Sequence, residues 1–186
     1  MKTLLRRNSI ALRDAIDYKK RQKKNGQIFN HLLGLPRFIN SRSVFCYVST
    51  GSEVDTRVII QHCLDNEIVL SVPKIAMYRK GLDVYKIESI NELSKGIFSI
   101  PEPTITNNAR LMDLRDIDLV IVPGLAFDLN MNRLGFGKGY YDKLLACINA
   151  YKIALCYEEQ IFDKVPTEPH DVKMNMIITD KRIING

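Results

Sequence analysis

The run Leu-Val-Ile-Val-Pro-Gly at residues 119–124 most strongly limits what this chain can fold into. Its first four residues are all apolar, so a strand here would be buried on both faces, as in a parallel sheet covered by helices. Residues 43–49 and 68–73 have the same apolar, β-rich character, and we expect the second of these strands to end at its proline. Helix-length segments separate such runs. The pattern predicts an α/β fold with a mostly parallel, open, Rossmann-like central sheet flanked by helices.

The N-terminal part of the chain predicts two helices. The first should cover about residues 3–18 and the second residues 27–33, ending at Gly34. The apolar positions that give the first helix its spacing are Leu5, Leu12, Ala15 and Ile16. The basic run at residues 19–24, together with Gly26, interrupts the pattern between the two helices. For this run a solvated helix end is favoured over a binding patch.

The remaining elements follow from turn residues and alternation. Asp55 or Ser52 is expected to cap a helix that ends near residue 66. Residues 82–87 alternate and predict a half-exposed strand, whereas the prolines in residues 97–106 predict an extended, irregular segment. The other predicted elements are a short helix at 90–93, a helix at 140–149 and strands at 153–157 and 176–179. We find no internal repeat and no linker, so residues 1–186 are predicted to form a single domain.

Composition excludes several classes of protein. Hydrophobic residues make up 46% and charged residues 26% of the chain, which is ordinary for a globular domain and excludes disordered and collagen-like chains. The apolar runs are too short to cross a bilayer. There are 27 Lys and Arg residues against 21 Asp and Glu, and the resulting charge of +6 favours anionic partners. The charge alone does not distinguish nucleic acid, anionic lipid and phosphorylated small molecules as partners.

The four cysteines, Cys46, Cys63, Cys147 and Cys156, lie in or beside apolar segments. They lack the spacing of a zinc site, so buried free thiols in a reducing compartment are expected. The N-terminus lacks the continuous apolar stretch of a signal peptide. These features predict a cytoplasmic protein.

The long segment after residue 124 carries the strongest chemical signal. Gly135, Gly137 and Gly139 alternate with other residues, which leaves backbone N–H groups free to approach an anion. Arg133 and Lys138 add fixed positive charge. The spacing matches neither the Walker nor the dinucleotide-binding pattern. The segment predicts a phosphate-binding loop, and a flexible glycine-rich turn with incidental charges is the alternative.

Residues 133–142, Arg-Leu-Gly-Phe-Gly-Lys-Gly-Tyr-Tyr-Asp, are preceded by Pro-Gly-Leu-Ala-Phe-Asp at residues 123–128. Together they resemble the signature of the 5-formyltetrahydrofolate cyclo-ligase family, also called methenyltetrahydrofolate synthetases. Residues 2–6, 52–56 and 165–171 resemble other segments of the same family, in the same order. The resemblance implies ATP- and Mg²⁺-dependent closure of 5-formyltetrahydrofolate to 5,10-methenyltetrahydrofolate, with release of ADP and phosphate. Phosphorylation of the formyl oxygen would precede attack by N10.

The same resemblance, with charge and position, implies the roles of individual residues. Lys138 and Arg133 are the expected catalytic residues, since basic groups stabilise the charge of a transferring phosphoryl group. The expected ATP-binding residues are Lys2, Thr3, Leu4, Leu5, Arg6, Arg133, Leu134, Gly135, Phe136, Gly137, Lys138, Gly139, Tyr140 and Tyr141. The expected folate-binding residues are Val48, Glu53, Phe136, Gly137, Lys138, Gly139 and Tyr140. Asp142 and Asp171 are the expected Mg²⁺ ligands.

Simpler interpretations remain open for several of these residues. Lys2 and Arg6 also fit an ordinary basic helix end, and Asp142 fits an exposed acid in the first turn of a helix. Asp171 fits a loop-capping residue, and Glu53 fits a solvated turn acid. No role is predicted for the three histidines.

Two other functions remain as alternatives. A nucleic-acid-binding protein would require basic residues interleaved with exposed aromatics, but aromatics make up only 8% of the chain and fall mostly within apolar strands. A CoA transferase or a sugar-phosphate isomerase of a similar fold would not require a triphosphate-binding loop with two aspartates. The expected partners are therefore small molecules, with no nucleic acid and no membrane, and the chain is expected to be a monomer.

Overall fold

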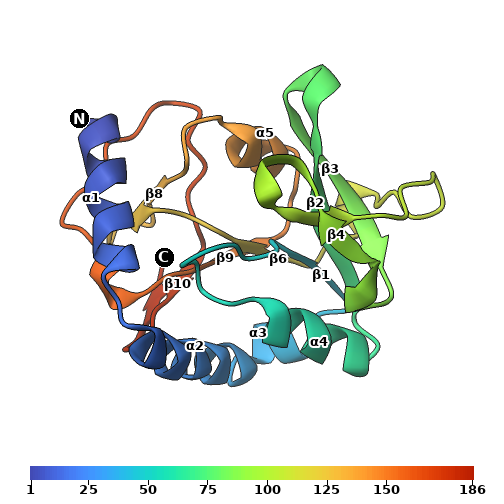
Figure 1. Cartoon of the computed structure of the whole chain (residues 1–186), viewed down its shortest axis with the longest axis horizontal. Coiled ribbons are helices and arrows are strands. Elements are labelled where there is room, and N and C mark those ends of the chain that lie inside the picture. Colours follow the sequence, from blue (N-terminus) through green and yellow to red (C-terminus); the bar gives the residue numbers. More distant parts are fainter.

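A seven-stranded sheet forms the centre of the computed structural model, which describes residues 1–186 (Figure 1). Its order is β11-β10-β9-β6-β1-β2-β3. The strands are β1 (Ser43–Cys46), β2 (Val69–Ala76), β3 (Gly81–Ile87), β6 (Leu119–Val122), β9 (Tyr151–Leu155), β10 (Met176–Ile178) and β11 (Ile183–Asn185). The five strands from β10 to β2 run parallel, and β3 and β11 are antiparallel edge strands. The predicted α/β fold with a mostly parallel open sheet is confirmed.

Helices cover both faces of this sheet. Helices α2 (Tyr18–Leu33), α3 (Pro36–Ile39) and α4 (Arg57–Asp65) lie on one face, and α5 (Tyr140–Ala146) lies on the other (Figure 1). Each face has its own apolar core, one including Leu32, Phe38 and Ile60 and the other including Leu144 and Leu145. Strand β6 is completely buried, as its uniform apolar run predicts. No helix is long and apolar enough to span a membrane.

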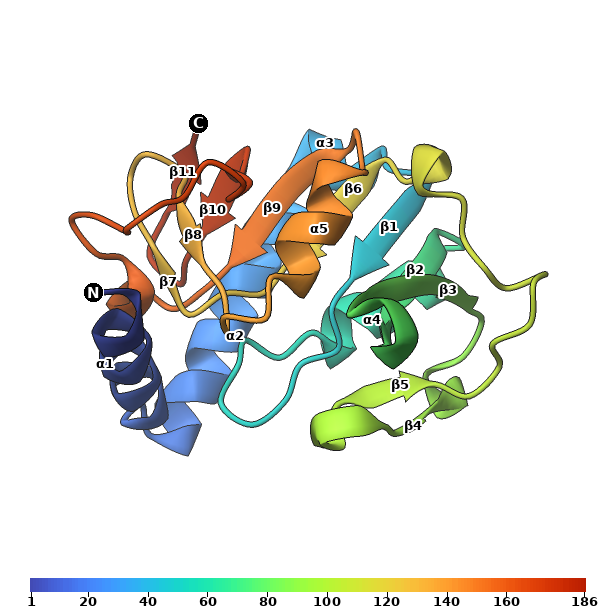
Figure 2. The same ribbon diagram turned by 90° about the horizontal axis from the view of Figure 1, so that it is seen from above.

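Smaller elements surround the main sheet. Strands β4 (Leu93–Lys95) and β5 (Pro101–Pro103) pair with each other and pack against β2, and β7 (Ala126–Phe127) pairs with β8 (Arg133–Leu134) (Figure 2). The prediction of an irregular segment at residues 97–106 is therefore wrong in part. Single 3₁₀ turns are η1 (Met77–Arg79), η2 (Ile90–Glu92), η3 (Ile97–Ser99), η4 (Leu114–Asp116) and η5 (Glu158–Gln160).

The strand order determines where a ligand can bind. From β1 the chain adds β2 and β3 on one side, whereas β6, β9 and β10 follow on the other side. The order thus reverses between β1 and β6, and ligands of open α/β sheets bind outside the carboxyl ends of the strands at such a point. Helix α1 (Lys2–Asp14) stands near this edge, beside β7 (Figure 2).

The N-terminal helices differ from the prediction in extent. Helix α2 begins at Tyr18, so the basic run lies inside it and Gly26 does not interrupt it. A mid-helix glycine costs about 1 kcal/mol. The Asp17 carboxylate, which accepts hydrogen bonds from the amides of Lys19 and Lys20, and the burial of Ile28 offset this cost.

The side of helix α1 that is buried differs from the side predicted to be buried. Its buried residues are Ser9 and Arg13, whereas Leu12 is 45% exposed and Ala15, just past its end, is also exposed. Of the predicted apolar positions, only Ile16 is buried. The fully buried positions of α1 are therefore polar, and Leu5 is only half-buried.

Other boundaries also shift. Strand β2 continues through Pro73, which is tolerated because β1 pairs with β2 only as far as Ser71. Helix α4 begins at Arg57, after Thr56, and although Asp55 accepts a hydrogen bond from the Arg57 amide, Ser52 takes no part in capping. Among the cysteines, Cys147 is exposed, contrary to expectation, because it follows the last turn of the short helix α5 on its solvent side.

Candidate functional site

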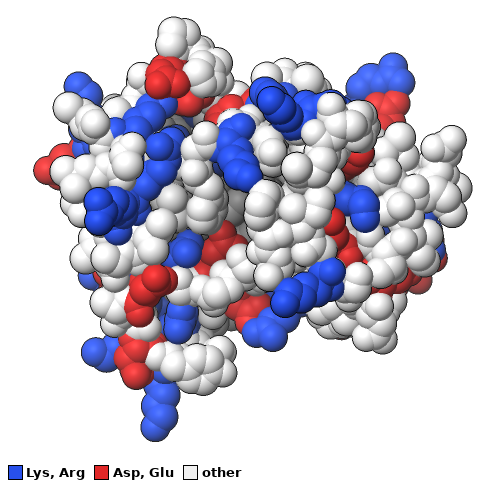
Figure 3. Space-filling model, turned by 45° about the horizontal axis from the view of Figure 1, so that its top comes forward, with Lys and Arg blue, Asp and Glu red and all other residues white.

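A cleft of about 690 Å³ opens at the carboxyl ends of β1 and β6, where the strand order reverses. Tyr47 and Val48 directly follow β1, Pro123 directly follows β6, and all three line the cleft. Figure 3 shows Lys and Arg side chains along the rim of a hollow on this face and Asp and Glu side chains within it. The cleft therefore combines a positive rim with carboxylates inside.

Nearly all of the predicted site residues line this one cleft. Those that do are Lys2, Arg6, Val48, Glu53, Arg133, Leu134, Gly135, Phe136, Gly137, Lys138, Gly139, Tyr140, Tyr141, Asp142 and Asp171. Thr3, Leu4 and Leu5 do not line it. Leu4 is 63% exposed, and Leu5 packs against the small apolar cluster of Ala126, Leu134 and Val165.

The segment of residues 135–139, which we call the glycine loop, forms one wall of the cleft. Gly137 has φ +103° and Gly139 has φ +66°, in the left-handed region that glycine adopts without strain. A Cβ atom at Gly137 would also come within 3.2 Å of Cζ of Arg6. The amides of the glycine loop donate no hydrogen bond to another group of the protein. They are therefore available to an anion.

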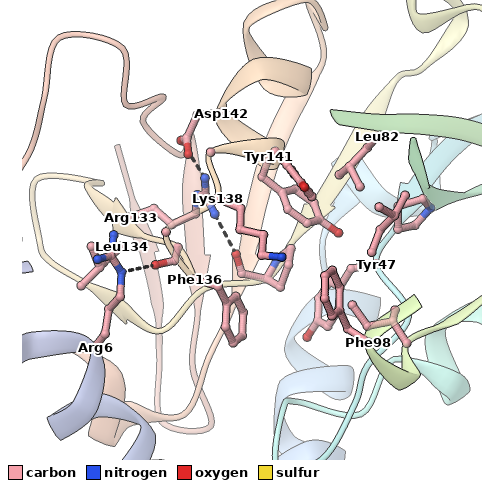
Figure 4. Close-up of a pocket in the computed structure, with 18 of the residues that line it drawn as sticks. Arg6, Tyr47, Leu82, Phe98, Arg133, Leu134, Phe136, Lys138, Tyr141 and Asp142 are labelled. Atoms are coloured by element: carbon pink, nitrogen blue, oxygen red, sulfur yellow. Dashed lines mark hydrogen bonds and ion pairs between the residues drawn. The ribbon is translucent and has the colours of Figure 1, made fainter. Parts of the chain in front are cut away.

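Arg133 is held rigidly beneath this wall. It is 4% exposed, its Nη2 donates to Oδ1 of Asp142 at 2.7 Å, and its Nη1 donates to the carbonyl of Pro123 at 3.2 Å (Figure 4). Its Nε is buried without a hydrogen-bond partner. Asp142 is thus the counter-ion of Arg133, not an exposed acid of the first helical turn.

Two further cations flank the glycine loop. Nε of Arg6, from α1, donates to the carbonyl of Gly135 at 2.9 Å (Figure 4). Nζ of Lys138 lies 3.7 Å from the centre of the Phe98 ring, on the other side of the cleft, and pairs with no carboxylate. Lys138 therefore offers a positive charge that no acid neutralises.

Lys2 lies at the same end of the cleft. Its Nζ is 2.8 Å from Oδ2 of Asp171 and 3.4 Å from Oε2 of Glu168. Burial alone would raise the pKa of Asp171, but the Lys2 ammonium and the Glu168 amide outweigh it and hold this pKa below its ordinary value. Burial would lower the pKa of Lys2, but the two carboxylates raise it.

The backbone next to Asp171 contacts Asp142, the other candidate metal ligand. The amide of Val172, the residue after Asp171, is 3.5 Å from Oδ1 of Asp142. Each carboxylate keeps one oxygen, Oδ2 of Asp142 and Oδ1 of Asp171, that accepts no hydrogen bond. Two carboxylates with free oxygens in one cleft suit Mg²⁺, which takes one or two protein carboxylates together with phosphate oxygens and waters. Glu168, His170 and Asp171 also bring their ligand atoms within 4.8 Å of one another.

Glu53 lies on the loop that follows β1. Its side chain is 10% exposed, and its Oε2 accepts hydrogen bonds from the amide of Thr50 at 2.8 Å and from the hydroxyl of Thr50 at 3.3 Å. Burial raises the pKa of Glu53, whereas the Thr50 amide and the charge of Arg13 oppose this rise. A solvated turn acid is therefore the wrong interpretation of Glu53.

The sequence did not identify several residues that complete the cleft. They are Tyr47, Thr50, Pro73, Ile75, Leu82, Phe98, Ile100, Glu102, Pro123, Glu168 and His170. Tyr47 and Pro123 could have been predicted, since Tyr47 lies within one predicted buried strand and Pro123 follows the apolar residues of another. Phe98 and Glu102 belong to the β4–β5 hairpin, whose position depends on contacts with β2 that no local pattern encodes.

Fold and site together define an α/β enzyme that binds anionic small molecules. A family model described as the 5-formyltetrahydrofolate cyclo-ligase family matches residues 1–180, and the chain belongs to this family. It is thus an enzyme of the ligase class, and family membership indicates 5-formyltetrahydrofolate cyclo-ligase activity on small-molecule substrates.

Individual relatives agree with this assignment. The 5-formyltetrahydrofolate cyclo-ligase of Mus musculus is 27% identical over 174 residues, which cover 88% of this chain and 86% of the relative. The structure of Aquifex aeolicus 5,10-methenyltetrahydrofolate synthetase superimposes with a TM-score of 0.88 at 31% identity, covering 99% of this chain and 92% of that one. A 5,10-methenyltetrahydrofolate synthetase from Mycoplasma pneumoniae has the same fold, with a TM-score of 0.77 at 22% identity and coverage of 96% and 98%.

Proposed function

We propose that this protein uses ATP and Mg²⁺ to convert 5-formyltetrahydrofolate to 5,10-methenyltetrahydrofolate, releasing ADP and phosphate. The proposal rests on one observation above all. A single cleft is lined both by a glycine loop with unpaired amides and three neighbouring cations, and by the buried carboxylate of Glu53. The first set of groups suits a triphosphate, and the second suits the N–H edge of a reduced pterin.

The chemistry requires activation of the formyl group. A formamide oxygen is a poor leaving group, so direct attack by N10 would stall. Transfer of the γ-phosphoryl group to this oxygen breaks the bond between the β-γ bridging oxygen and the γ-phosphorus and releases ADP. N10 then attacks the formyl carbon, loses its proton, and the C–O bond breaks to release phosphate. Because both nitrogens belong to one molecule, ring closure is intramolecular and is accelerated by orientation.

At the phosphate end of the cleft, the chain would bind and stabilise charge. The amides of the glycine loop and the guanidinium of Arg6 would hold the nucleotide phosphates. Lys138, which has no acidic partner, would interact with the transferring phosphoryl group, where fixed charge has its largest effect. Arg133, fixed by Asp142 and Pro123, would complete the positive surface.

The remaining assignments follow the same charge logic. Asp142 and Asp171 would hold Mg²⁺ through their free oxygens. Bound there, the ion would neutralise charge on the phosphates. Glu53 would accept hydrogen bonds from the pterin N–H groups, and Val48, directly after β1, would pack against the pterin ring.

The purified protein, incubated with ATP, Mg²⁺ and 5-formyltetrahydrofolate, provides the test. We expect the methenyl chromophore to form only when all three are present, with one ADP released for each product molecule. Formation of the chromophore without ATP, or no chromophore under complete conditions, would contradict the proposal.

A further inference from the structure

The buried face of helix α1 is a polar stripe. Lys2, Arg6, Ser9 and Arg13 are spaced four, three and four residues apart, so they share one side of the helix. Lys2 and Arg6 line the cleft, and the Ser9 hydroxyl donates to the carbonyl of Leu125. Arg13 lies one turn beyond Ser9. The reaction described above assigns no role to it.

Arg13 is one of the few buried arginines of the protein, at 7% exposure. Its Nε donates to the hydroxyl of Ser52 at 2.8 Å, and that hydroxyl donates in turn to Asp14. Its Nη1 lies 4.0 Å from Oε1 of Glu53 and is buried without a hydrogen-bond partner. A guanidinium is costly to bury unless its charge is used, and Glu53 is the acidic group that it faces inside the protein.

The two carboxylate oxygens of Glu53, which lines the cleft, have different partners. Oε2 is occupied by the amide and the hydroxyl of Thr50, whereas Oε1 accepts no hydrogen bond from the protein. Oε1 is also the oxygen nearest Arg13. An ionised carboxylate presents only acceptors, which is what the N–H edge of a pterin requires, whereas a protonated one would place a donor against donors.

We propose that Arg13 is a positioning residue for folate binding: its charge keeps the Glu53 carboxylate ionised in a dry wall, and its bond to Ser52 fixes the turn that carries Glu53. The inference rests on the proposed function, since it assumes that Glu53 binds the pterin. It assigns the far end of α1 to the folate, whereas Lys2 and Arg6 at the near end belong to the phosphates.

No other group near Glu53 supplies a positive charge. Tyr47, at the end of β1, and Tyr141, on α5, both face it, but burial and the charge of Glu53 raise the pKa of each well above the ordinary range, so both are neutral. Thr50 contributes uncharged donors from the same loop. Asp14, which is reached through Ser52, supplies no positive charge. Arg13 is therefore the charged group that favours the ionised form of Glu53, together with the hydrogen bonds from Thr50.

The test is the dissociation constant of 5-formyltetrahydrofolate, measured by calorimetry without nucleotide between pH 5.5 and pH 8.5. In Arg13→Gln we expect the acid limb of the profile to move to higher pH, so that binding is weakened several-fold at the acid end of this range and much less at pH 8.5. Ser52→Ala removes the bond to Arg13 but keeps the charge. This control should weaken binding equally at every pH.

A uniform loss of affinity across the pH range in Arg13→Gln, like that expected of Ser52→Ala, would overturn the inference, because it would indicate a purely structural role. If Arg13→Gln does not fold, Arg13→Met fills the same space without a buried polar group and must give the same shift of the acid limb. Arg13→Lys keeps the charge and must leave the limb in place. If the unmodified protein does not bind 5-formyltetrahydrofolate at all, the proposed function itself fails.

Discussion

The two ends of the cleft hold their charges in different ways. At the phosphate end, Lys2 is paired with Asp171 and Arg133 with Asp142, so the two cations that we propose to bind phosphates neutralise the two carboxylates that we propose to bind Mg²⁺. At the pterin end, Glu53 is bonded by its own loop and buried. Under the proposed function, the first end must exchange these ion-pair partners when a nucleotide enters, whereas Glu53 at the second end is already held in place for the pterin. The cleft thus has one end whose ion pairs must rearrange before a ligand binds and another end that is preformed.

The largest effect is expected at Lys138, a cation of the phosphate end that pairs with no acid and lies in the glycine loop itself. Lys138→Ala should lower kcat about 10²–10³-fold, because charge aimed at the transferring group is lost. Since the residue lies in a loop and its amine contacts only aromatic rings, the fold should be retained. The measurement is the rate of chromophore formation at saturating substrates.

Lys143→Ala is the matched control for this prediction. Lys143 lies on α5 only five residues away and contacts the carbonyl of Lys80 outside the cleft. Its replacement should leave kcat unchanged. Equal kcat values for the two variants would remove Lys138 from the reaction.

At the preformed end, Glu53→Gln is expected to act on one substrate alone. Replacing an acceptor by an amide places donors against the pterin edge, and we expect the Kd of 5-formyltetrahydrofolate to rise about 10- to 100-fold. The Kd of ATP should not change. Titration of each ligand separately measures both, and equal losses for the two ligands would mean that the ends are not independent.

Asp142→Asn tests the exchange of partners at the phosphate end. The Mg²⁺ concentration for half-maximal rate should rise about tenfold, because a ligand becomes neutral and Arg133 loses its counter-ion. Asp163→Asn, at an exposed position outside the cleft, is the control. An unchanged metal titration for Asp142→Asn would mean that Asp142 does not bind Mg²⁺ and serves only as the counter-ion of Arg133.

The smallest effect concerns the Lys2–Asp171 pair and the stability of the free protein. The folded-state pKa of Asp171 is lowered from 3.8, so its contribution is present above about pH 4 and is lost as the pH falls through the folded value. The pKa of Lys2 is raised from 10.5, so its contribution is present below that value and is lost at higher pH. Lys2→Met should therefore lower the free energy of unfolding by less than about 1 kcal/mol at pH 7.

Urea unfolding at two pH values tests this last prediction. The difference between Lys2→Met and the unmodified protein should shrink as the pH falls below 3.8, because Asp171 then becomes protonated in the folded as well as in the unfolded state. A difference that persists there would come from packing of the Lys2 side chain and not from its charge.

Much of the fold could be predicted because local sequence determines it. The apolar runs that became β1 and β6 are completely buried, and most of the run in β2 is buried as well. The glycine loop after β6 needs glycine where φ is positive. The extent of α2 could not be predicted from its basic run, since the helix is stabilised by burial of Ile28 and Leu32 against the sheet. Residue type and spacing contain no information on that burial.

The sequence predicts the part of the site whose residues are consecutive. It does not predict contacts between residues that are far apart in the chain. Residues 133–142 were identified together with their charges, but the pairing of Lys2 with Asp171 joins residues 169 positions apart. Arg13 was missed for a different reason. The apolar spacing of α1 predicts that Leu12 is buried, whereas the residues that are buried are the polar Ser9 and Arg13.

This polar face makes α1 sensitive to length as well as to composition. Lys2, Arg6 and Arg13 keep a common direction only because the helical phase is preserved between them, and removal of one residue would rotate everything on one side of the deletion by about 100°. A deletion between Arg6 and Arg13 would swing the guanidinium of Arg13 away from Glu53 even though every side chain is still present. The function of α1 therefore depends on the number of residues between these side chains. Insertions or deletions within the helix should be tolerated less well than substitutions of its exposed residues.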